Sequence, residues 1–420
     1  MPWGMVIWLV MVALVGLTWS LRHLTISRAQ KHNRRLTAAS HPPFGADAPR
    51  LSVLVAAKDE AATIATCVRT LADQDYPNYE IIVIDDRSTD GTAGIIDALA
   101  EEFPDKVRAL HVAHLPEGWF GKNNAMRTGV AAADGEWFCF VDADCRQTSR
   151  STLTAALREA LERKADFLSV LPVLETRSFW ERLIQPVCAA ILVIWFNPEK
   201  VNDPKSKAAY ANGAFMLMSR AHYVAIGGHE RVRTELNEDM HMARITKECG
   251  RRLFVVENDG LYLTRMYASF AETWRGWSRI FYGVFKTFRR LAATLGLLLT
   301  ASVFPCVSLV VAAVGYAVAE GAERRTWGIA LVITAAVVAM LESVIYRFMR
   351  LTRSASWAWM TYPLGALLGV GMLLAAMRKL AGGRTTWRGT TYRGERHDPG
   401  GTPAPQAQAI ETKERAVDAA

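Results

Sequence analysis

The stretch WFCFVDADC (residues 137–145) joins an apolar run to two aspartates that are separated by one alanine. The run has the length of a buried strand, and the chain leaves it through Asp142, Ala143 and Asp144. In open α/β sheets, ligands bind beyond the carboxyl ends of the strands, so this pair is expected at a binding edge. Two carboxylates beside a small alanine can hold Mg²⁺ or Mn²⁺ and leave positions open for diphosphate oxygens.

Other apolar runs alternate with helical patterns on both sides of this stretch. This alternation predicts an α/β domain with a mostly parallel sheet. The expected strands are residues 51–57, 80–85, 107–113, 137–142, 167–173 and 214–219, and the expected helices are residues 60–71, 92–101, 123–132, 151–163 and 238–249.

Acidic residues also follow the first two expected strands. The first ends in Lys58, Asp59 and Glu60, and the second ends in Asp85 and Asp86. Carboxylates gathered at one edge repel each other and need a cation or hydrogen-bond donors between them. Asp59, Glu60 and Asp86 are candidates for accepting hydrogen bonds from the base and ribose of a nucleotide. The alternative for each acidic strand end, the 142–144 pair included, is turn or helix-cap chemistry, which is the commoner role of an isolated pair. Because three strand ends in series are acidic, the metal site is favoured over turn or cap roles.

Two further motifs supply a cation and a candidate base. The loop GWFGKNNAM (residues 118–126) enters a helix, where Lys122 could offset diphosphate charge, although a solvated surface lysine is the alternative. Glu238 and Asp239 open the helix at residues 238–249. A carboxylate there is held ionised by the helix dipole and suits a general base, with an ordinary first-turn acid as the alternative.

Four long apolar segments account for much of the 51% hydrophobic content. Residues 1–21, 291–319 and 354–377 contain no charged residue, and residues 326–346 contain only Glu342. Each is long enough to span a bilayer. The first lacks the preceding basic region of a secretory signal. Basic residues directly after it place the α/β domain in the cytoplasm, and the chain is expected to be a multi-pass protein of the cell (inner) membrane.

These features predict the organisation of the chain. The expected parts are an anchor at residues 1–21, a basic linker at 22–50, the α/β domain at 51–285, a membrane region at 291–377, and a basic interfacial segment with a disordered tail at 378–420. The net charge of +8 lies mainly in the flanks and tail, where it favours anionic lipid headgroups over nucleic acid. Six cysteines without a CxxC pair indicate reduced thiols.

The expected crossings conflict with the charge of the tail. Three crossings after a cytoplasmic domain would place the tail outside, yet Arg378, Lys379 and later arginines predict the inside. One segment is therefore expected to be re-entrant, with residues 291–319 and 326–346 as candidates. Residues 183–196 are apolar but short and contain Pro186, which predicts an interfacial or buried helix.

Taken together, the motifs resemble glycosyltransferase family 2, the inverting enzymes of the GT-A fold. The resemblance covers residues 51–285 and rests on six stretches in order: AAKDEAATI, VIDDRSTDGT, GWFGKNNAM, FVDADC, YANGAFMLMSR and NEDMHMAR. The single anchor, the GWFGK loop and the carboxyl-terminal spans are similar to hopene-associated and carotenoid glycosyltransferases, and to ceramide glucosyltransferases.

The resemblance implies a UDP-sugar donor and a lipid or polyisoprenoid-type acceptor hydroxyl at the cytoplasmic face. It places Asp86, with Asp59 or Glu60, near the nucleoside, Asp144 and Asp142 at a divalent metal, and Asp239 as the base. The residues it implies on the acceptor side are Asn212, Gly213, Glu238, Trp277 and Arg279.

The chain departs from many relatives in one motif. A Q-x-x-R-W pattern is replaced by ETWRGWSR (residues 272–279), which makes a processive polysaccharide synthase less consistent with the sequence. A nucleotidyltransferase acting on a lipid phosphate would also use paired acids, a metal and an anion-binding loop. A non-catalytic membrane scaffold is a third alternative.

Overall fold

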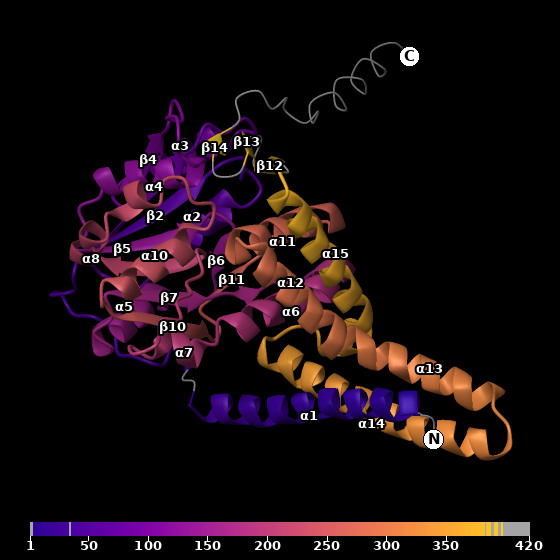
Figure 1. The fold of residues 1–420 in the computed structure, drawn as a ribbon. Coiled ribbons are helices and arrows are strands. Elements are labelled where there is room, and N and C mark those ends of the chain that lie inside the picture. The colour runs from indigo at the N-terminus through magenta and orange to yellow at the C-terminus, as the bar shows by residue number, and fades with distance from the viewer. Residues whose placement is uncertain (1–2, 33–34, 383, 388–389, 394–395, 398–420) are drawn as a thin grey trace, which may run out of the picture.

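The computed structural model describes residues 3–32, 35–382, 384–387, 390–393 and 396–397. The tail that the sequence predicts to be disordered lies outside these residues from position 398 onward. Figure 1 shows a large α/β body from which a group of long helices projects.

An eight-stranded sheet forms the centre of the body, in the spatial order β1-β10-β7-β9-β5-β2-β3-β4. Every neighbouring pair is parallel except that β9 is antiparallel to both β5 and β7. The predicted α/β fold with a mostly parallel sheet is confirmed. The strands are β1 (Arg35–Leu36), β2 (Leu51–Ala57), β3 (Tyr79–Asp85), β4 (Val107–His111), β5 (Trp137–Asp142), β7 (Phe167–Leu171), β9 (Phe215–Ser219) and β10 (Leu253–Asn258).

Helices cover both faces of this sheet. Side chains alternate between the two faces along each strand, so apolar residues are buried under helices on both sides. On β2, Val53 and Val55 belong to one buried hydrophobic cluster, whereas Leu54 belongs to another. Burial on both faces explains why the strands are continuously apolar. The helices of the body are α2 (Ile64–Ala72), α3 (Thr92–Glu102), α4 (Gly121–Ala131), α5 (Thr152–Glu162), α7 (Pro198–Asn202), α8 (Arg220–Ala225), α9 (Gly228–Arg231) and α10 (Glu238–Glu248).

The register of three strands brings their acidic ends together. In β2, Ala56 pairs with Asp142 of β5, and Ala57 pairs with Asp85 of β3. The carboxyl ends of these parallel strands therefore lie side by side at one edge of the sheet, as the sequence predicts.

Two small sheets accompany the large one. β6 (Cys145–Gln147) pairs antiparallel with β11 (Tyr262–Thr264), which pairs in parallel with β8 (Val173–Leu174). The third sheet contains β12 (Arg384–Trp387), β13 (Thr390–Arg393) and β14 (Arg396–His397), where the sequence predicts an interfacial segment.

Four helices pack on one another beside the body, and we call them the collar. They share a buried apolar core that includes Ile184, Trp277, Phe281, Leu291 and Leu373. The collar comprises α6 (Phe179–Trp195), α11 (Phe270–Phe285), α12 (Phe288–Leu298) and α15 (Tyr362–Leu380), the last preceded by the 3₁₀-helix η2 (Ser356–Thr361). The short apolar segment with Pro186 is thus a helix whose inner face is buried.

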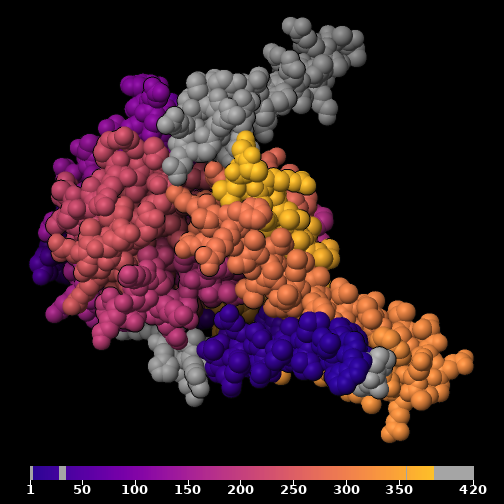
Figure 2. Space-filling model, viewed as in Figure 1, coloured from indigo at the N-terminus to yellow at the C-terminus, as the bar shows by residue number. Residues whose placement is uncertain are grey.

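The projecting group consists of α1 (Trp3–His32), α13 (Phe304–Val318) and α14 (Gly321–Leu351). Figure 2 shows it extending beyond the body as a separate arm, which we call the bundle. A π-helical turn, η1 (Leu299–Val303), joins α12 to α13 just before Pro305, whose missing N–H such a wide turn accommodates. Four helices are long and apolar enough to cross a membrane: Trp3–Ser27, Phe288–Val318, Gly321–Leu351 and Trp357–Leu380. The first continues as helix to His32, into the predicted linker.

Candidate active site

The Lys122 side chain lies between the two acidic motifs that the sequence singles out. Its Nζ is 2.7 Å from Asp142 Oδ1 and 2.8 Å from Glu238 Oε1. Asp142 ends β5, Lys122 is in the first turn of α4, and Glu238 begins α10. Burial lowers the pKa of Lys122, but the two carboxylates outweigh burial and raise it well above the usual value. Lys122 is therefore a fixed positive charge in an acidic cleft, not a solvated surface lysine.

Asp239 is held beside this ion pair by two backbone groups. The N–H of Gly213 donates to Asp239 Oδ2 at 2.8 Å, and the N–H of Met240 donates to Oδ1 at 2.7 Å. A Cβ on Gly213 would lie 3.2 Å from Lys122 Nζ and 3.4 Å from Asp239 Oδ2. Glycine at position 213 thus allows the lysine and the aspartate to approach the same point of the backbone.

The pKa of Asp239 suits proton transfer near neutral pH. Burial raises this pKa to about 7, and the charge of Glu238 adds to the effect. Lys122 and the hydrogen bonds from Met240 and Gly213 act in the opposite direction. A carboxyl group with this pKa can accept a proton and release it again at physiological pH.

Asp144 is a second, partly buried acid. Thr264 Oγ1 of β11 donates to Asp144 Oδ1 at 2.9 Å. Burial raises the pKa of Asp144 to about 7, with further contributions from the charges of Asp142 and Glu60, whereas Lys122 lowers it. Since the charge of Lys122 lowers the pKa of both Asp144 and Asp239, the two aspartates lie near the same ammonium group.

The acids around Asp144 are of the chemical type that binds a divalent cation. Asp142, Asp144 and Glu60 influence one another electrostatically while each is at least partly shielded from water. Carboxylate oxygens are the ligands that Mg²⁺ and Mn²⁺ prefer. A cation on Asp144 would offset the repulsion that now raises the pKa of this group.

The acids predicted near the nucleoside already have partners within the chain. Asp86 is buried and accepts hydrogen bonds from Arg87 Nε at 2.8 Å and Nη2 at 3.0 Å. A Cβ on Gly121 would overlap its carboxylate, so Asp86 abuts the first turn of α4. Asp59 Oδ1 accepts the N–H of Thr89 at 2.8 Å. Asp59 thus accepts a hydrogen bond from the loop after β3. The Asp86 carboxylate lies beside the N-terminus of α4.

The residues implied on the acceptor side fall into two groups. Asn212 and Gly213 lie at the cleft, where the Asn212 N–H donates to Ser169 Oγ at 2.9 Å. Trp277 is instead buried within the collar core. Arg279 lies near Tyr267, because its charge lowers the pKa of that phenol while burial, the larger effect, raises it.

Three contacts join the cleft to the collar. Lys286 Nζ, just after α11, is 2.6 Å from Glu235 Oε2, and Gly283 of α11 lies against the Asn237 side chain. On the other side of the cleft, Arg265 Nε is 3.1 Å from the fully buried Glu181 of α6. Arg265 directly follows Thr264, the partner of Asp144. The start of α10 and the end of β11 are therefore both tied to the collar.

Comparison with known proteins agrees with this geometry. Residues 52–227 match the family model for glycosyl transferase family 2. This segment of the chain belongs to glycosyltransferase family 2. The match covers β2 to the end of α8 and includes Lys122, Asp142 and Asp144.

Relatives and a solved structure extend the comparison. A β-monoglucosyldiacylglycerol synthase of Nostoc is 40% identical over 103 residues, which are 24% of this chain and 21% of that protein. A 4,4'-diaponeurosporenoate glycosyltransferase of Staphylococcus aureus is 25% identical over 231 residues, which are 54% of this chain and 60% of that one. The chain thus spans about a fifth and three fifths of the length of these relatives. A mannosyltransferase from Pyrobaculum calidifontis, solved with GDP-mannose and Mn²⁺, is 20% identical, covers 81% of this chain and 99% of its own, and has a TM-score of 0.51. It shares the fold.

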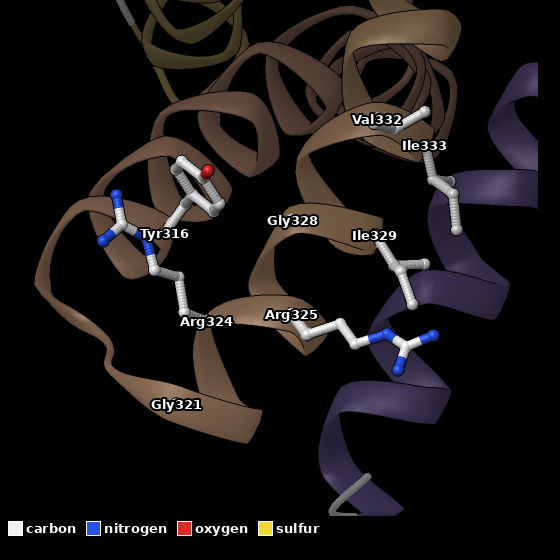
Figure 3. Close-up of a pocket in the computed structure, with 8 residues that line it drawn as sticks. All are labelled: Tyr316, Gly321, Arg324, Arg325, Gly328, Ile329, Val332 and Ile333. Atoms are coloured by element: carbon white, nitrogen blue, oxygen red, sulfur yellow. The ribbon is translucent and has the colours of Figure 1, made fainter.

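Two other features lie apart from the cleft of this glycosyltransferase. A cavity of about 540 Å³ lies between α13 and the start of α14 and is lined by Tyr316, Arg324, Arg325 and apolar residues of α14 (Figure 3). His41, Glu159 and Glu162 bring ligand-type atoms within 4.8 Å of one another. Because Arg163 also pairs with Glu159 at 2.8 Å, this cluster is compensated by the chain itself.

The sequence did not identify every residue that shapes the cleft. Thr264 and Arg265 come from a short strand near the end of the domain, where no motif marks them. Arg87 was passed over because a basic residue beside Asp86 looks like an ordinary turn residue. Their roles depend on which strands meet, and one sequence does not show that.

The raised pKa of Asp144 predicts a pH-dependent response to metal. The folded, metal-free protein holds this proton at higher pH than the unfolded chain, so the group lowers stability as pH rises from about 4 to about 7. Protons compete with the cation for Asp144 below about pH 7. We expect Mn²⁺ to raise the melting temperature more at about pH 8 than at about pH 6. Asp144→Asn should remove the rise in melting temperature that Mn²⁺ causes. Asp105→Asn, at an exposed turn, should retain this rise. Equal increments at both pH values would contradict this prediction.

The ion pairs of Lys122 predict a stability effect. Lys122→Met leaves Glu238, which is 3% exposed, without its cation. Breaking a buried pair costs about 3–5 kcal/mol, and the partial exposure of Lys122 and Asp142 reduces this to about 1–3 kcal/mol. Lys200→Met, at an exposed lysine of α7, should change the free energy of unfolding by less than about 0.5 kcal/mol. Denaturation of both variants in detergent, without metal, measures the difference; equal stabilities would rule out the bridging role.

Proposed function

We propose that this chain transfers a sugar from a nucleotide-diphosphate donor, a UDP-sugar, to a hydroxyl group of a lipid or polyisoprenoid-type acceptor. The transfer inverts the anomeric carbon and takes place at the cytoplasmic face of the cell membrane. The observation that carries this proposal is the position of Lys122 between Asp142 of the strand-end motif and Glu238 beside Asp239. Donor-side acids and a candidate base thereby share one cleft.

The donor would lie across the carboxyl ends of β2, β3 and β5. The nucleoside would lie near Asp86 and Asp59, whose carboxylates hold Arg87 and the loop after β3, and the diphosphate would extend toward Lys122 and the first turn of α4. Free N–H groups at a helix N-terminus favour an anion. A divalent cation held by Asp144 and Asp142 would supply positive charge to the diphosphate as the bond to the sugar breaks. The mannosyltransferase of the same fold was solved with a nucleotide sugar and Mn²⁺.

Asp239 would act as the base in a single displacement. Its two backbone hydrogen bonds fix the orientation of the carboxylate, and its pKa of about 7 allows it to take the proton of the acceptor hydroxyl. The hydroxyl oxygen then attacks the anomeric carbon, and the nucleoside diphosphate leaves. Lys122 would compensate the negative charge of the leaving diphosphate, for which it must exchange part of its pairing with Asp142.

A lipid acceptor is supported by the surroundings of the base. The loop before α10 contacts α11 through Glu235 and Lys286, and α11 belongs to the collar beside the apolar helices. An acceptor that is embedded in a leaflet would reach Asp239 from this side. The names of two relatives refer to diacylglycerol and to a carotenoid acid, which are both lipid-soluble.

The decisive variant is Asp239→Asn. The amide keeps the size of the side chain but cannot accept the proton, so transfer should fall by at least about 10²-fold while donor binding stays within about threefold. Membranes that contain the chain, a UDP-sugar and extracted lipids would be tested for UDP release and for glycosylated lipid. Glu199→Gln changes an exposed first-turn acid of α7 and is the matched control, expected to remain fully active.

Three results would count against the proposal. Wild-type turnover by Asp239→Asn would refute the assignment of the base. Release of pyrophosphate in place of UDP would indicate a nucleotidyltransferase acting on a lipid phosphate. Failure of the wild-type chain to bind any nucleotide sugar in the presence of Mn²⁺ would favour a non-catalytic membrane scaffold.

A further inference from the structure

We propose that α15 lies in the interfacial region of the leaflet nearest the catalytic domain and does not cross the bilayer. The chain would then cross three times, through α1, η1 with α13, and α14. Residue 381 would emerge on the same side as the catalytic domain. The occupant of the exposed face of α15 would be the lipid of that interfacial region, at the level of the headgroups and the first acyl carbons. The inference does not depend on the proposed reaction.

The three helices of the bundle are aligned by contacts along their length. α1 and α14 run in the same direction, because Trp8 stacks against Trp327 and His23 Nε2 lies 2.9 Å from Ser343 Oγ. α13 runs in the opposite direction: Trp8 Nε1 donates to Ser308 Oγ at 3.0 Å, and Trp19 Nε1 donates to the Ala301 carbonyl at 2.8 Å. The bundle thus consists of three roughly co-extensive helices.

One end of the bundle is attached to the catalytic domain. Arg35 of β1 donates through Nη2 to the Leu351 carbonyl at 2.9 Å, and Arg353 forms an ion pair with Asp259 after β10. The loop between α13 and α14, at residues 319–320, lies at the opposite end, away from the body (Figure 1). One end of the bundle therefore lies at the catalytic domain, and the other end lies at the loop between α13 and α14.

The apolar lengths of the three helices match one bilayer. Residues 299–318, from the start of η1 to the end of α13, extend about 30 Å at 1.5 Å per residue, which is the thickness of the hydrocarbon core. The uncharged part of α1 ends before Arg22, and Arg347 of α14 donates to Ser27 Oγ at 2.8 Å. The level of Arg22, Arg347 and η1 is thus the boundary of the hydrocarbon core on the domain side.

α15 begins at that boundary and returns toward the domain. Tyr362, at its start, is hydrogen-bonded to Ser302 of η1 at 2.8 Å. Further along, Gly369 lies against Leu298 of α12, so α15 runs antiparallel to α12. In Figure 1, α15 leads back along the catalytic domain to β12, whereas α13 and α14 project away from it.

Close packing against other collar helices fixes this position. A Cβ on Gly365 would lie 2.7 Å from the Leu183 carbonyl of α6, and one on Gly371 would lie 2.5 Å from the Trp274 ring of α11. Cys188 of α6 and Met372 have sulfur atoms 3.9 Å apart. Small residues thus seat α15 on α6 and α11, two helices that are tied to the cleft.

The remaining face of α15 is apolar and exposed. Leu364, Leu367 and Leu374 recur at spacings of three and seven residues, which places them on one side of the helix, and all are more than two fifths exposed. The neighbouring α6 exposes Val193 and Ile194. Arg378 and Lys379 at the end of α15 match anionic headgroups.

A non-spanning α15 also removes the conflict between the crossings and the basic residues near the tail. Three crossings return the chain to the side of the catalytic domain, where Arg378 and Lys379 are expected. The sequence favoured residues 291–319 or 326–346 as the exceptional segment. Both of these instead contribute aligned helices to the bundle.

Cysteine labelling in sealed membrane vesicles tests the topology. Ala381→Cys and Glu320→Cys are exposed positions at the end of α15 and in the loop between α13 and α14, and the exposed native Cys249 marks the catalytic domain. A membrane-impermeant maleimide, read out by mass spectrometry of peptides, should label the thiol introduced at position 381 together with Cys249. The thiol introduced at position 320 should be labelled from the other side. Labelling in denaturing detergent gives the maximum extent of labelling of each thiol. Labelling of positions 381 and 320 from the same side would overturn the proposal.

Depth measurements test the orientation of α15 independently. Nitroxides would be attached to cysteines introduced in place of Leu364, Leu367 and Leu374 in a Cys249→Ala background, with Val332, Ala336 and Ala339 of α14 as matched spanning positions. Accessibility to oxygen and to a water-soluble nickel chelate should give similar, shallow depths on α15 and greater depths on α14. A depth on α15 that reaches the bilayer centre would show that it crosses. Neither experiment requires activity, so its failure is distinguishable from failure of the proposed reaction.

Discussion

The site depends on one partly buried ammonium group between two carboxylates. Lys122 connects the end of β5, the start of α4 and the start of α10, three elements that are far apart in sequence. Without this charge, the acids around Asp142 and Glu238 would repel one another in a partly dry environment. The same ammonium group influences the protonation of Asp144 and of Asp239, so the metal side and the base side of the cleft are electrostatically linked.

The acids of the site differ in their surroundings. Asp239 is held by backbone N–H groups, Asp144 by a threonine hydroxyl, Asp142 by the lysine, and Asp86 by its neighbouring arginine. Only the first two combine burial with a pKa near 7 among the described aspartates with a resolved shift. Environment, not residue type, therefore separates a proton acceptor from a structural carboxylate.

Much of this arrangement could be predicted from the sequence. The strand at residues 51–57 and the one at residues 137–142 were predicted with their observed bounds, because continuous apolar runs bounded by acids leave little ambiguity. The partners of Lys122 could not be predicted, since a diphosphate and two carboxylates attract the same charge. Trp277 looked like a site residue in sequence, but its burial in the collar depends on how α6, α11 and α15 pack. Hydropathy also gives α15 the composition of a spanning helix, and only its contacts distinguish it from the bundle.

The collar connects the α/β domain to the apolar helices. It contacts the loop before α10 through Glu235 and the residue after β11 through Glu181, so its position sets where the site lies relative to those helices. The central claim is that Asp144 and Asp239 serve one cleft. An experimental structure with Mn²⁺ and UDP tests it most directly. We predict Mn²⁺ bound to Asp144, with the diphosphate between it and Lys122 and Asp239 facing the same space. Metal and nucleotide bound away from Asp144, or an Asp239 that faces a separate surface, would contradict the account.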